Sequence, residues 1–347
     1  MIPATEEELT DDENGQLYEH QRLVVDKGQV PLRIDKFMCE HLQHTSRNRI
    51  QKAADAGFVH VNEKPVKSNY KVRPGDVITL MLDRPQYDSS IEPEEIPLNV
   101  VYEDSELMVI NKPAGMVVHP GCGNYHGTLV NAVAWHLRDV PGYDPNDPEV
   151  GLVHRIDKDT SGLLVVAKTP LAKTKLGVQF FNKTTHRSYN ALVWGNFVED
   201  DGRIEGNIGR DPKDRLRMAV FPPSSEIGKP AVTHYRVLQR FGYVTLVECI
   251  LETGRTHQIR AHMKHIGHPL FSDERYGGNE ILRGERCGTY QQFVRNCFKI
   301  CPRQALHAKT LGFVHPKTGQ QMDFTSELPD DMQMLIEKWQ KRVPVRE

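Results

Sequence analysis

The chain has 347 residues, of which 38% are hydrophobic and 26% are charged, and its formal net charge is −2. This composition is typical of a soluble globular protein with room for one large and one small domain, and the charge argues against a general polyanion binder. No apolar run approaches the length of a membrane span and the acidic N-terminus does not have the pattern of a signal peptide, so we expect a cytoplasmic protein without a membrane partner.

The chain begins with an acidic segment. Residues 1–20 contain seven Asp or Glu residues and no Lys or Arg, which leaves the rest of the chain with a net charge of +5. Such a segment cannot bury enough apolar surface to fold. We therefore expect a disordered acidic tail on a mildly basic body.

The segment 21–82 has the pattern of a small αα-β unit. Apolar spacing predicts helices over 32–42 and 47–56, and strands at 22–25, 58–61 and 77–81. Between positions 33 and 73 nine basic residues stand against four acidic ones. Charge alone is compatible with an ordinary solvated surface or with phosphate contact by a basic helix face.

This unit resembles the S4 RNA-binding module. The similarity lies in four short segments, at 32–37, 46–50, 57–62 and 72–76. With that resemblance we favour RNA binding, and we expect the basic side chains of the two helices to contact RNA phosphates: Arg33, Arg47, Arg49 and Lys52.

Residues 83–97 are rich in proline and acid and have no apolar period, which predicts a linker before a second domain at 98–347. In that domain the apolar pattern predicts helices at 128–137, around 259–266 and at 329–343. The predicted strands lie at 100–102, 107–110, 151–153, 163–167, 189–194, 235–237, 243–251, 303–308 and 311–316.

The most polar connection of the second domain lies between the apolar runs 151–153 and 163–167. It contains His154, Arg155, Asp157, Lys158, Asp159, Thr160 and Ser161. Cationic neighbours favour the ionised form of a carboxylate, which suits a nucleophile or an acid beside a phosphate. A calcium loop is excluded, because Lys168 stands where that loop requires a bidentate Glu.

A second polar segment, 251–262, and the residues after it contain four histidines, at positions 257, 262, 265 and 268. We do not expect a metal, because Arg255, Arg260 and Lys264 crowd the same segment and no His pair at i, i+4 encloses a Glu. The six cysteines are scattered and form neither a disulfide framework nor paired zinc knuckles.

The pattern His154-Arg155-x-Asp157-x-x-Thr160-Ser161-Gly162 resembles the signature of the RluA family of RNA pseudouridine synthases. The segments 112–121, 228–235 and 251–262 occur, with the signature, in the family's order. They are most similar to the family's RluD type, which modifies the helix 69 stem–loop of large-subunit (23S) ribosomal RNA. The resemblance implies an α+β fold: a catalytic domain on a bisected, mainly antiparallel mixed sheet, with an active cleft across its middle, and the S4-like domain beside it.

The resemblance also implies roles for single residues. Asp157 would be the catalytic carboxylate, Tyr189 would stack on the flipped base, and Arg260 would pair with Asp157. Arg155 would fill the space that the base leaves in the RNA. The reaction needs neither a cofactor nor a metal.

Around position 215 four cations are, by themselves, more typical of a solvated surface than of a binding site. In an RNA enzyme we expect Arg215 and Arg217 to contact phosphates. The expected partner is 23S ribosomal RNA or the assembling large subunit, bound by a monomer. A non-catalytic ribosomal RNA-binding or assembly factor, and a synthase that acts on transfer RNA, are the alternatives.

Overall fold

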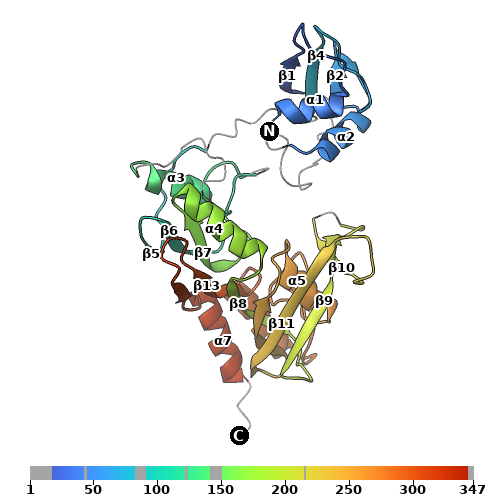
Figure 1. Cartoon of the computed structure of the whole chain (residues 1–347). Coiled ribbons are helices and arrows are strands. Elements are labelled where there is room, and N and C mark those ends of the chain that lie inside the picture. The colour runs from blue at the N-terminus through green and yellow to red at the C-terminus, as the bar shows by residue number, and fades with distance from the viewer. Residues whose placement is uncertain are drawn as a thin grey trace. The chain divides into compact units, whose positions relative to one another are not determined.

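The computed structural model describes residues 18–42, 45–82, 91–121, 124–140, 151–214 and 216–342. The chain divides into two compact units, Met1–Ser89 and Ser90–Glu347, each with its own apolar core (Figure 1). Within the described ranges, every helix is too short or too polar to cross a membrane.

The N-terminal unit is a four-stranded antiparallel sheet, in the order β1-β4-β2-β3, packed against two helices. The predicted αα-β arrangement is therefore present. Residues 18–20 of the expected tail belong to β1, whereas 1–17 lie outside the described residues. The elements are β1 (Tyr18–Val24), α1 (Ile34–His41), α2 (Arg47–Asp55), β2 (Val59–Val61), β3 (Lys64–Pro65) and β4 (Val77–Leu82).

The C-terminal unit is built on one large mixed sheet, in the order β10-β9-β11-β12-β8-β13-β7-β6-β5, with β14 paired to β13. Its pairings are antiparallel except for a short parallel contact between β13 and β7. The strands are β5 (Val100–Glu103), β6 (Leu107–Lys112), β7 (Ser161–Ala167), β8 (His186–Trp194), β9 (Asp201–Arg210), β10 (Met218–Phe221), β11 (Lys229–Arg240), β12 (Val244–Leu251), β13 (Leu306–Val314) and β14 (Gln321–Thr325). This sheet confirms the expected α+β class.

The parallel contact depends on a glycine. Gly162 has a φ of 116°, and a Cβ at this position would lie 2.3 Å from the carbonyl oxygen of Ala308. Only glycine allows this backbone conformation and this approach at once. The glycine that closes the signature motif thus lets β7 meet β13 at the middle of the sheet.

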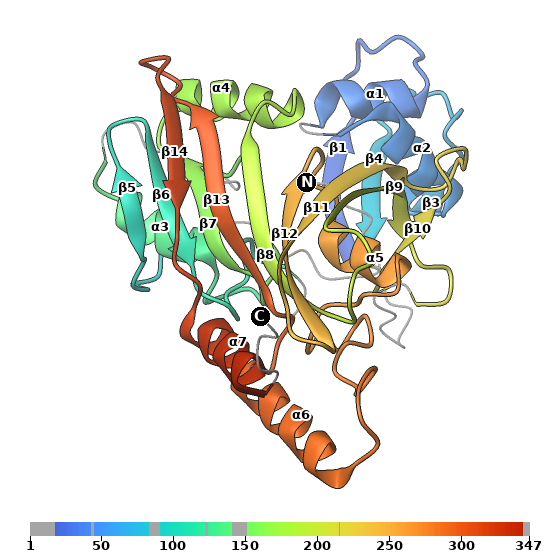
Figure 2. The same ribbon diagram turned by 90° about the horizontal axis from the view of Figure 1, so that it is seen from below.

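Among the residues described for this unit, the helices are α3 (Leu129–Leu137), α4 (Pro170–Phe181), α5 (Gln258–His265), α6 (Gly288–Ile300) and α7 (Asp330–Arg342). The helices α6 and α7 are in contact (Figure 2). Trp339 of α7 packs edge to face on Trp194 of β8, with ring centroids 6.4 Å apart. The apolar pattern predicted α3, α5 and α7, whereas α4 and α6 were not expected.

Two strand predictions are wrong in detail. Residues 151–153 form no strand, because Gly151 adopts a φ of 71° and only Leu152 bridges Val166. The strands expected at 303–308 and 311–316 are a single strand, β13, which begins at Leu306. A register shift between Ala308 and Thr310 explains why the apolar pattern breaks there.

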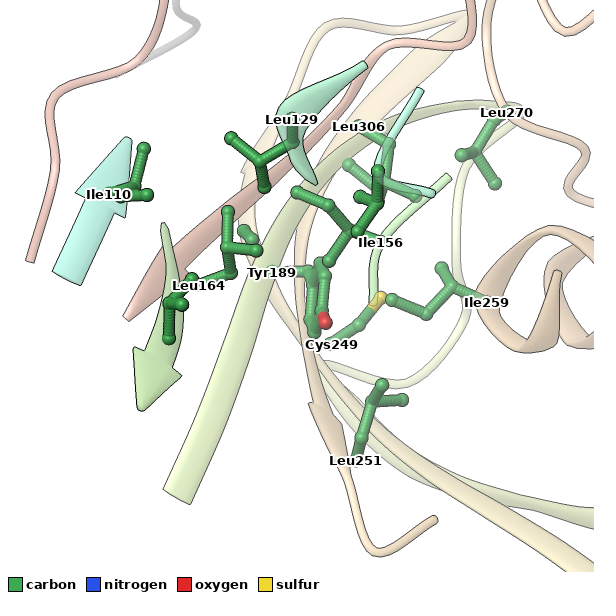
Figure 3. Packing of buried hydrophobic residues seen from close by; sticks show 14 of the residues in the cluster. Ile110, Leu129, Ile156, Leu164, Tyr189, Cys249, Leu251, Ile259, Leu270 and Leu306 are labelled. Atoms are coloured by element: carbon green, nitrogen blue, oxygen red, sulfur yellow. The ribbon is translucent and has the colours of Figure 1, made fainter. Parts of the chain in front are cut away.

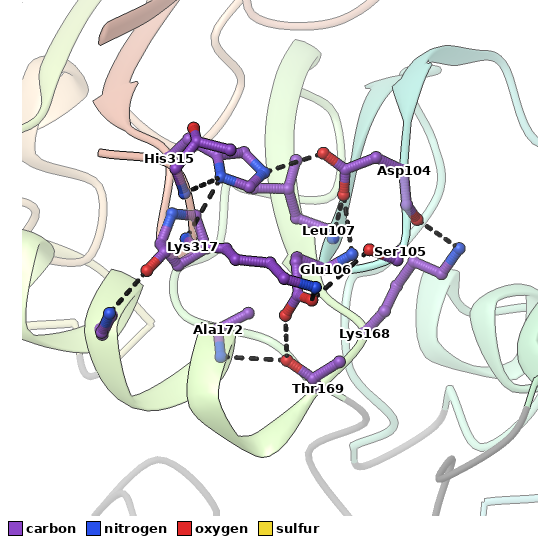
Figure 4. A network of polar contacts seen from close by, with 12 residues as sticks. Asp104, Ser105, Glu106, Leu107, Lys168, Thr169, Ala172, His315 and Lys317 are labelled. Atoms are coloured by element: carbon purple, nitrogen blue, oxygen red, sulfur yellow. Dashed lines mark hydrogen bonds and ion pairs between the residues drawn. The ribbon is translucent and has the colours of Figure 1, made fainter. Parts of the chain in front are cut away.

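A polar network closes the end of β7 that lies opposite the signature motif (Figure 4). His315 Nε2 bonds to Asp104 Oδ2 at 2.8 Å, and Lys317 Nζ donates to Glu106 Oε1 at 2.8 Å. Thr169 Oγ1 donates to the other oxygen of Glu106 and accepts from the backbone N–H of Ala172, which caps α4. The β5–β6 turn, α4 and the β13–β14 hairpin are thereby joined.

Candidate active site

The backbone directly after Asp157 is held by two basic side chains, Lys112 and Arg303. Lys112 is fully buried at the end of β6, and its Nζ donates to the carbonyl oxygens of Pro113, Met116 and Lys158 at 2.7, 2.8 and 2.9 Å. Burial lowers the pKa of Lys112 to about 7. The Nζ group of Lys112 therefore joins the loop after β6 to the loop that carries the signature motif.

Arg303 holds the next residue of the same loop. Its Nη1 donates to the carbonyl oxygen of Asp159 at 2.9 Å, and its Nε and Nη2 bind the two carboxylate oxygens of Asp331 at 2.7 and 2.9 Å. His307 bridges Ser161 Oγ and Ser326 Oγ at 2.9 and 2.8 Å. The loop is held by side chains that lie far away in the sequence.

His154 is a structural residue of this loop. Its Nε2 accepts a hydrogen bond from the backbone N–H of Val165 at 3.0 Å, and its ring stacks on Phe180 with centroids 4.4 Å apart. Burial, with the nearby charge of Arg187, lowers the pKa of His154 to about 3. The ring is neutral near pH 7 and its Nε2 is already occupied.

Asp157 forms an ion pair with Arg260. Arg260 Nη1 donates to Asp157 Oδ2 at 3.1 Å, while Arg260 Nε and Nη2 bind the fully buried carboxylate of Asp273 at 2.7 and 2.9 Å. Burial disfavours the charge of Arg260, but the two carboxylates outweigh it and raise its pKa. Within the described residues, Asp157 Oδ1 receives no hydrogen bond, so one oxygen remains for a substrate.

The α5 helix presents Arg260 in a fixed direction. The buried Gln258 accepts from Thr253 Oγ1 at 2.7 Å and from the backbone N–H of Arg255 at 3.0 Å, and it donates to the carbonyl of Val232 at 2.9 Å. Ile259 packs into the main apolar core. In the sequence Gln258-Ile259-Arg260 the first residue fixes the loop, the second anchors the helix and the third reaches Asp157.

Tyr189 lies at the centre of the sheet, on β8 between Cys249 of β12 and Ala308 of β13. The side chain is only 7% exposed and lies among Ile156, Cys249 and Leu306 (Figure 3). Burial raises the pKa of its hydroxyl, which stays protonated near neutral pH.

Asp157, Tyr189 and Arg260 line one cavity of about 550 Å³. This volume falls within the range of small-ligand sites. The structure thus brings together the three residues that the sequence singled out for catalysis. The cavity is also lined by the end of α4, the start of β8 and the segment 251–260.

Comparison with known proteins identifies the family to which the chain belongs. A family model described as RNA pseudouridylate synthase matches residues 106–265, and a model of the S4 domain matches residues 32–78. A Chlorobaculum parvum protein named "Uncharacterized RNA pseudouridine synthase" is 46% identical over 317 residues, which cover 91% of this chain and 96% of the relative. The chain belongs to the RNA pseudouridine synthase family. The synthase therefore isomerises uridine to pseudouridine in RNA.

Other relatives agree. The Ribosomal large subunit pseudouridine synthase D of Nitrosomonas europaea is 44% identical over 315 residues, with 91% of this chain and 86% of the relative covered. The solved structure of human RNA Pseudouridylate Synthase Domain Containing 4 has a TM-score of 0.56 at 21% identity, over 70% of this chain and 93% of that chain, and shares the fold. The resemblances to the synthase family and to the S4 module are confirmed.

Two of the cations expected to bind RNA have structural partners in the synthase. Arg33 binds both oxygens of Asp35 at 3.0–3.1 Å, and Arg47 Nε reaches Asp35 at 3.0 Å. Arg49 and Lys52 lie on α2. Each of the two arginines thus binds the buried carboxylate of Asp35 with some of its guanidinium nitrogens.

The cations expected to bind RNA in the C-terminal unit differ from one another. Arg155 is exposed at the cavity. Arg217 lies 3.2 Å from carboxylate oxygens of both Asp211 and Asp214, so its charge is already balanced. Arg215 lies outside the described residues.

The histidines of the 251–268 segment make separate contacts. His262 Nδ1 bonds to Thr233 Oγ1 at 2.9 Å, and His268 Nδ1 to the carbonyl of Trp194 at 2.7 Å. His257 Nδ1 bonds to Tyr276 Oη at 3.1 Å. In the part of the chain that the structure describes, no three His, Cys, Asp or Glu residues are grouped as metal ligands would be.

Sequence reasoning missed several residues of the site: Lys112, Asp273, Arg303 and His307. Asp273 follows an apolar run, as many surface acids do, so no local signal marks it. Lys112 precedes a proline–glycine turn, where a lysine is usually solvated. Only the long-range contacts reveal their roles.

Proposed function

We propose that this synthase modifies uridines in the helix 69 stem–loop of 23S ribosomal RNA, with Asp157 as its catalytic carboxylate. The substrate is supported by the large-subunit synthase relatives at 44% and 42% identity and by the S4 domain. The same proposal has the protein act as a monomer in the cytoplasm, without a cofactor, on free ribosomal RNA or on the assembling subunit.

The observation that carries the catalytic assignment is the Asp157–Arg260 ion pair in the cavity that Tyr189 lines. The reaction breaks the N1–C1′ bond of uridine, turns the uracil, and joins C5 to C1′; the proton leaves C5 and N1 gains one. Asp157 supplies the carboxylate that acts on the nucleotide in this isomerisation. Arg260 favours the ionised form of that carboxylate and orients it. Arg260 is itself oriented, because Asp273 binds the other edge of the guanidinium.

Tyr189 would stack on the uracil once the nucleotide has flipped into the cavity. Stacking on an aromatic side chain contributes about 1–3 kcal/mol per base. Flipping costs a few kcal/mol, and least where the base is in a loop. The stacking energy therefore offsets much of the flipping energy for a loop uridine, which favours a stem–loop substrate.

Pseudouridine mapping of all cellular RNA, from cells with and without the gene, tests the substrate. Loss of signals from helix 69 alone, restored by the unchanged gene and not by Asp157→Asn, is the expected result. Loss confined to transfer RNA would replace the proposed substrate. Unchanged RNA, together with binding of ribosomal RNA by the purified protein, would favour the assembly-factor alternative.

A further inference from the structure

Another arginine of the cavity, Arg187, has no hydrogen-bonding or charged partner among the residues that the structure describes. Arg187 lies on β8 two residues before Tyr189, so both side chains emerge on the same face of the strand. Its side chain lines the cavity although the residue is only 7% exposed. Within the described residues, no carboxylate lies within 4.0 Å of Arg187, and its buried Nε has no hydrogen-bond acceptor.

The contacts of Arg187 are apolar or uncharged. Its guanidinium carbon lies 5.3 Å from the ring centroid of Phe180, and a Cβ on Gly254 would lie 2.9 Å from Arg187 Nη1. The absence of a side chain at Gly254 thus leaves the guanidinium its space. Arg260, which is equally buried, binds two carboxylates instead.

A guanidinium is always charged, and an unpaired charge in a buried position is strongly unfavourable. A side chain kept in that state at a cavity wall is therefore set up for an anion that arrives with the substrate. The cavity has further positive character, because the segment 254–258, which leads into the N-terminus of α5, lines it together with Lys183 and Arg255. RNA brings one negative phosphodiester per nucleotide, whereas uracil is neutral.

We propose that Arg187 binds a phosphodiester of the RNA next to the target uridine and so sets how deeply the flipped nucleotide enters the cavity. The inference rests on the proposed stacking of the base against Tyr189. Arg187 would then be a substrate-positioning residue. Its bidentate donors match two phosphate oxygens, which a lysine matches less well.

The test compares Arg187→Gln and Arg187→Lys with Arg236→Gln. The control removes the same charge from strand β11, outside this cavity, where Arg236 Nη2 binds Glu248 at 2.7 Å. Binding of a labelled helix 69 hairpin is measured in the Asp157→Asn background, so that no product forms. Turnover is measured in the Asp157 protein as tritium release from RNA labelled at uridine C5.

For Arg187→Gln we expect RNA affinity to fall about tenfold to a hundredfold, because a hydrogen-bonded charge is lost. The slope of log affinity against log salt should become shallower by about one, as for one lost phosphate contact. Arg187→Lys should recover part of the affinity, and Arg236→Gln should retain it. A methylphosphonate at the phosphate beside the target uridine should weaken binding of the arginine protein but not further weaken that of Arg187→Gln.

Thermal unfolding separates this role from a structural one. Because Arg187 has no hydrogen bond or ion pair to lose among the described residues, Arg187→Gln should unfold at the same or a higher temperature. Unchanged RNA affinity and salt slope for Arg187→Gln, or a lower unfolding temperature with unchanged affinity, would overturn the inference. Failure of the proposed function looks different: the unsubstituted protein would release no tritium from helix 69, and Arg187 would then be judged by binding alone.

Discussion

Two of the aspartates that arginine binds in this protein, Asp35 and Asp157, are left in different states. In the N-terminal unit Asp35 is fully buried and receives hydrogen bonds from Arg33, Arg47 and Gln51. Burial opposes its ionisation, but these donors outweigh burial and hold the pKa of Asp35 well below its usual range. In the C-terminal unit Asp157 is 25% exposed and has one hydrogen bond, from Arg260.

The difference teaches how the same pair of residue types serves structure or chemistry. The oxygens of Asp35 are consumed by the fold, so its carboxylate can only stabilise α1 and α2. Asp157 shares its arginine with Asp273, which binds the Nε and Nη2 atoms of the guanidinium at shorter distances. The fold thereby orients Asp157 without using up its oxygens.

The largest effect is expected from Asp157→Asn. This substitution keeps the shape of the side chain but removes the charge, and we expect turnover to fall by at least about a thousandfold. Tritium release from C5-labelled RNA measures it, and RNA affinity and unfolding temperature should stay close to those of the unsubstituted protein. Appreciable turnover by this variant would refute the catalytic role of Asp157.

Asp273→Asn tests whether the second carboxylate orients Arg260. The amide can accept only one of the two hydrogen bonds, so Arg260 should turn and Asp157 should lose its direction. We expect turnover to fall by about a hundredfold, as for a small misplacement of a reacting group. The effect should appear in kcat more than in KM; a change confined to KM would mean that Asp273 acts on RNA binding instead.

Asp35→Asn probes the structural aspartate. We expect it to lower the stability of the N-terminal unit by about 1–3 kcal/mol, since hydrogen bonds between charged groups are lost. Limited proteolysis or hydrogen exchange of residues 18–82 measures the change, while turnover on a short hairpin that is saturating should stay the same. Loss of kcat at saturation would contradict this assignment.

A last effect, on stability, is expected from mild acid. Burial lowers the pKa of His154 to about 3 and those of His262 and His307 to about 4, below the value of about 6.5 expected in the unfolded chain. The unfolded state then binds more protons between pH 6.5 and 4, so this stability is fully present above pH 6.5 and is lost as the pH falls toward 4. Unfolding temperatures across this range measure it, and His307→Gln should make the decline shallower.

The sequence predicted the residues proposed to react better than it predicted the residues that hold them in place. Asp157, Tyr189 and Arg260 could be found because a short motif marks each of them. Arg33 and Arg187 look alike in the sequence, since each is an arginine near an apolar run. Arg33 nevertheless holds a buried carboxylate, whereas Arg187, within the described residues, has no carboxylate within 4.0 Å. That distinction depends on which strands and helices meet, which local patterns do not encode.

The elements that were missed have the same cause. The apolar spacing of α4 is weak, because Leu171, Val178 and Phe181 are exposed and only Ala172 and Leu176 are buried. The strands β10 and β14 contain no buried residue, and the buried hydrophobic residues of β9 are only Ile204 and Ile208. Their pairing with longer neighbours, rather than their own composition, makes them strands.

The anchoring of the Asp157 loop has a consequence for folding kinetics. Lys112 and Lys158 are 46 residues apart, whereas Asp157 and Arg260 are 103 apart and require β8 to have joined both halves of the sheet. Closing the longer loop costs more chain entropy, and contacts of high sequence separation form late. During refolding from denaturant, the helical and strand signals should therefore return before enzymatic activity does.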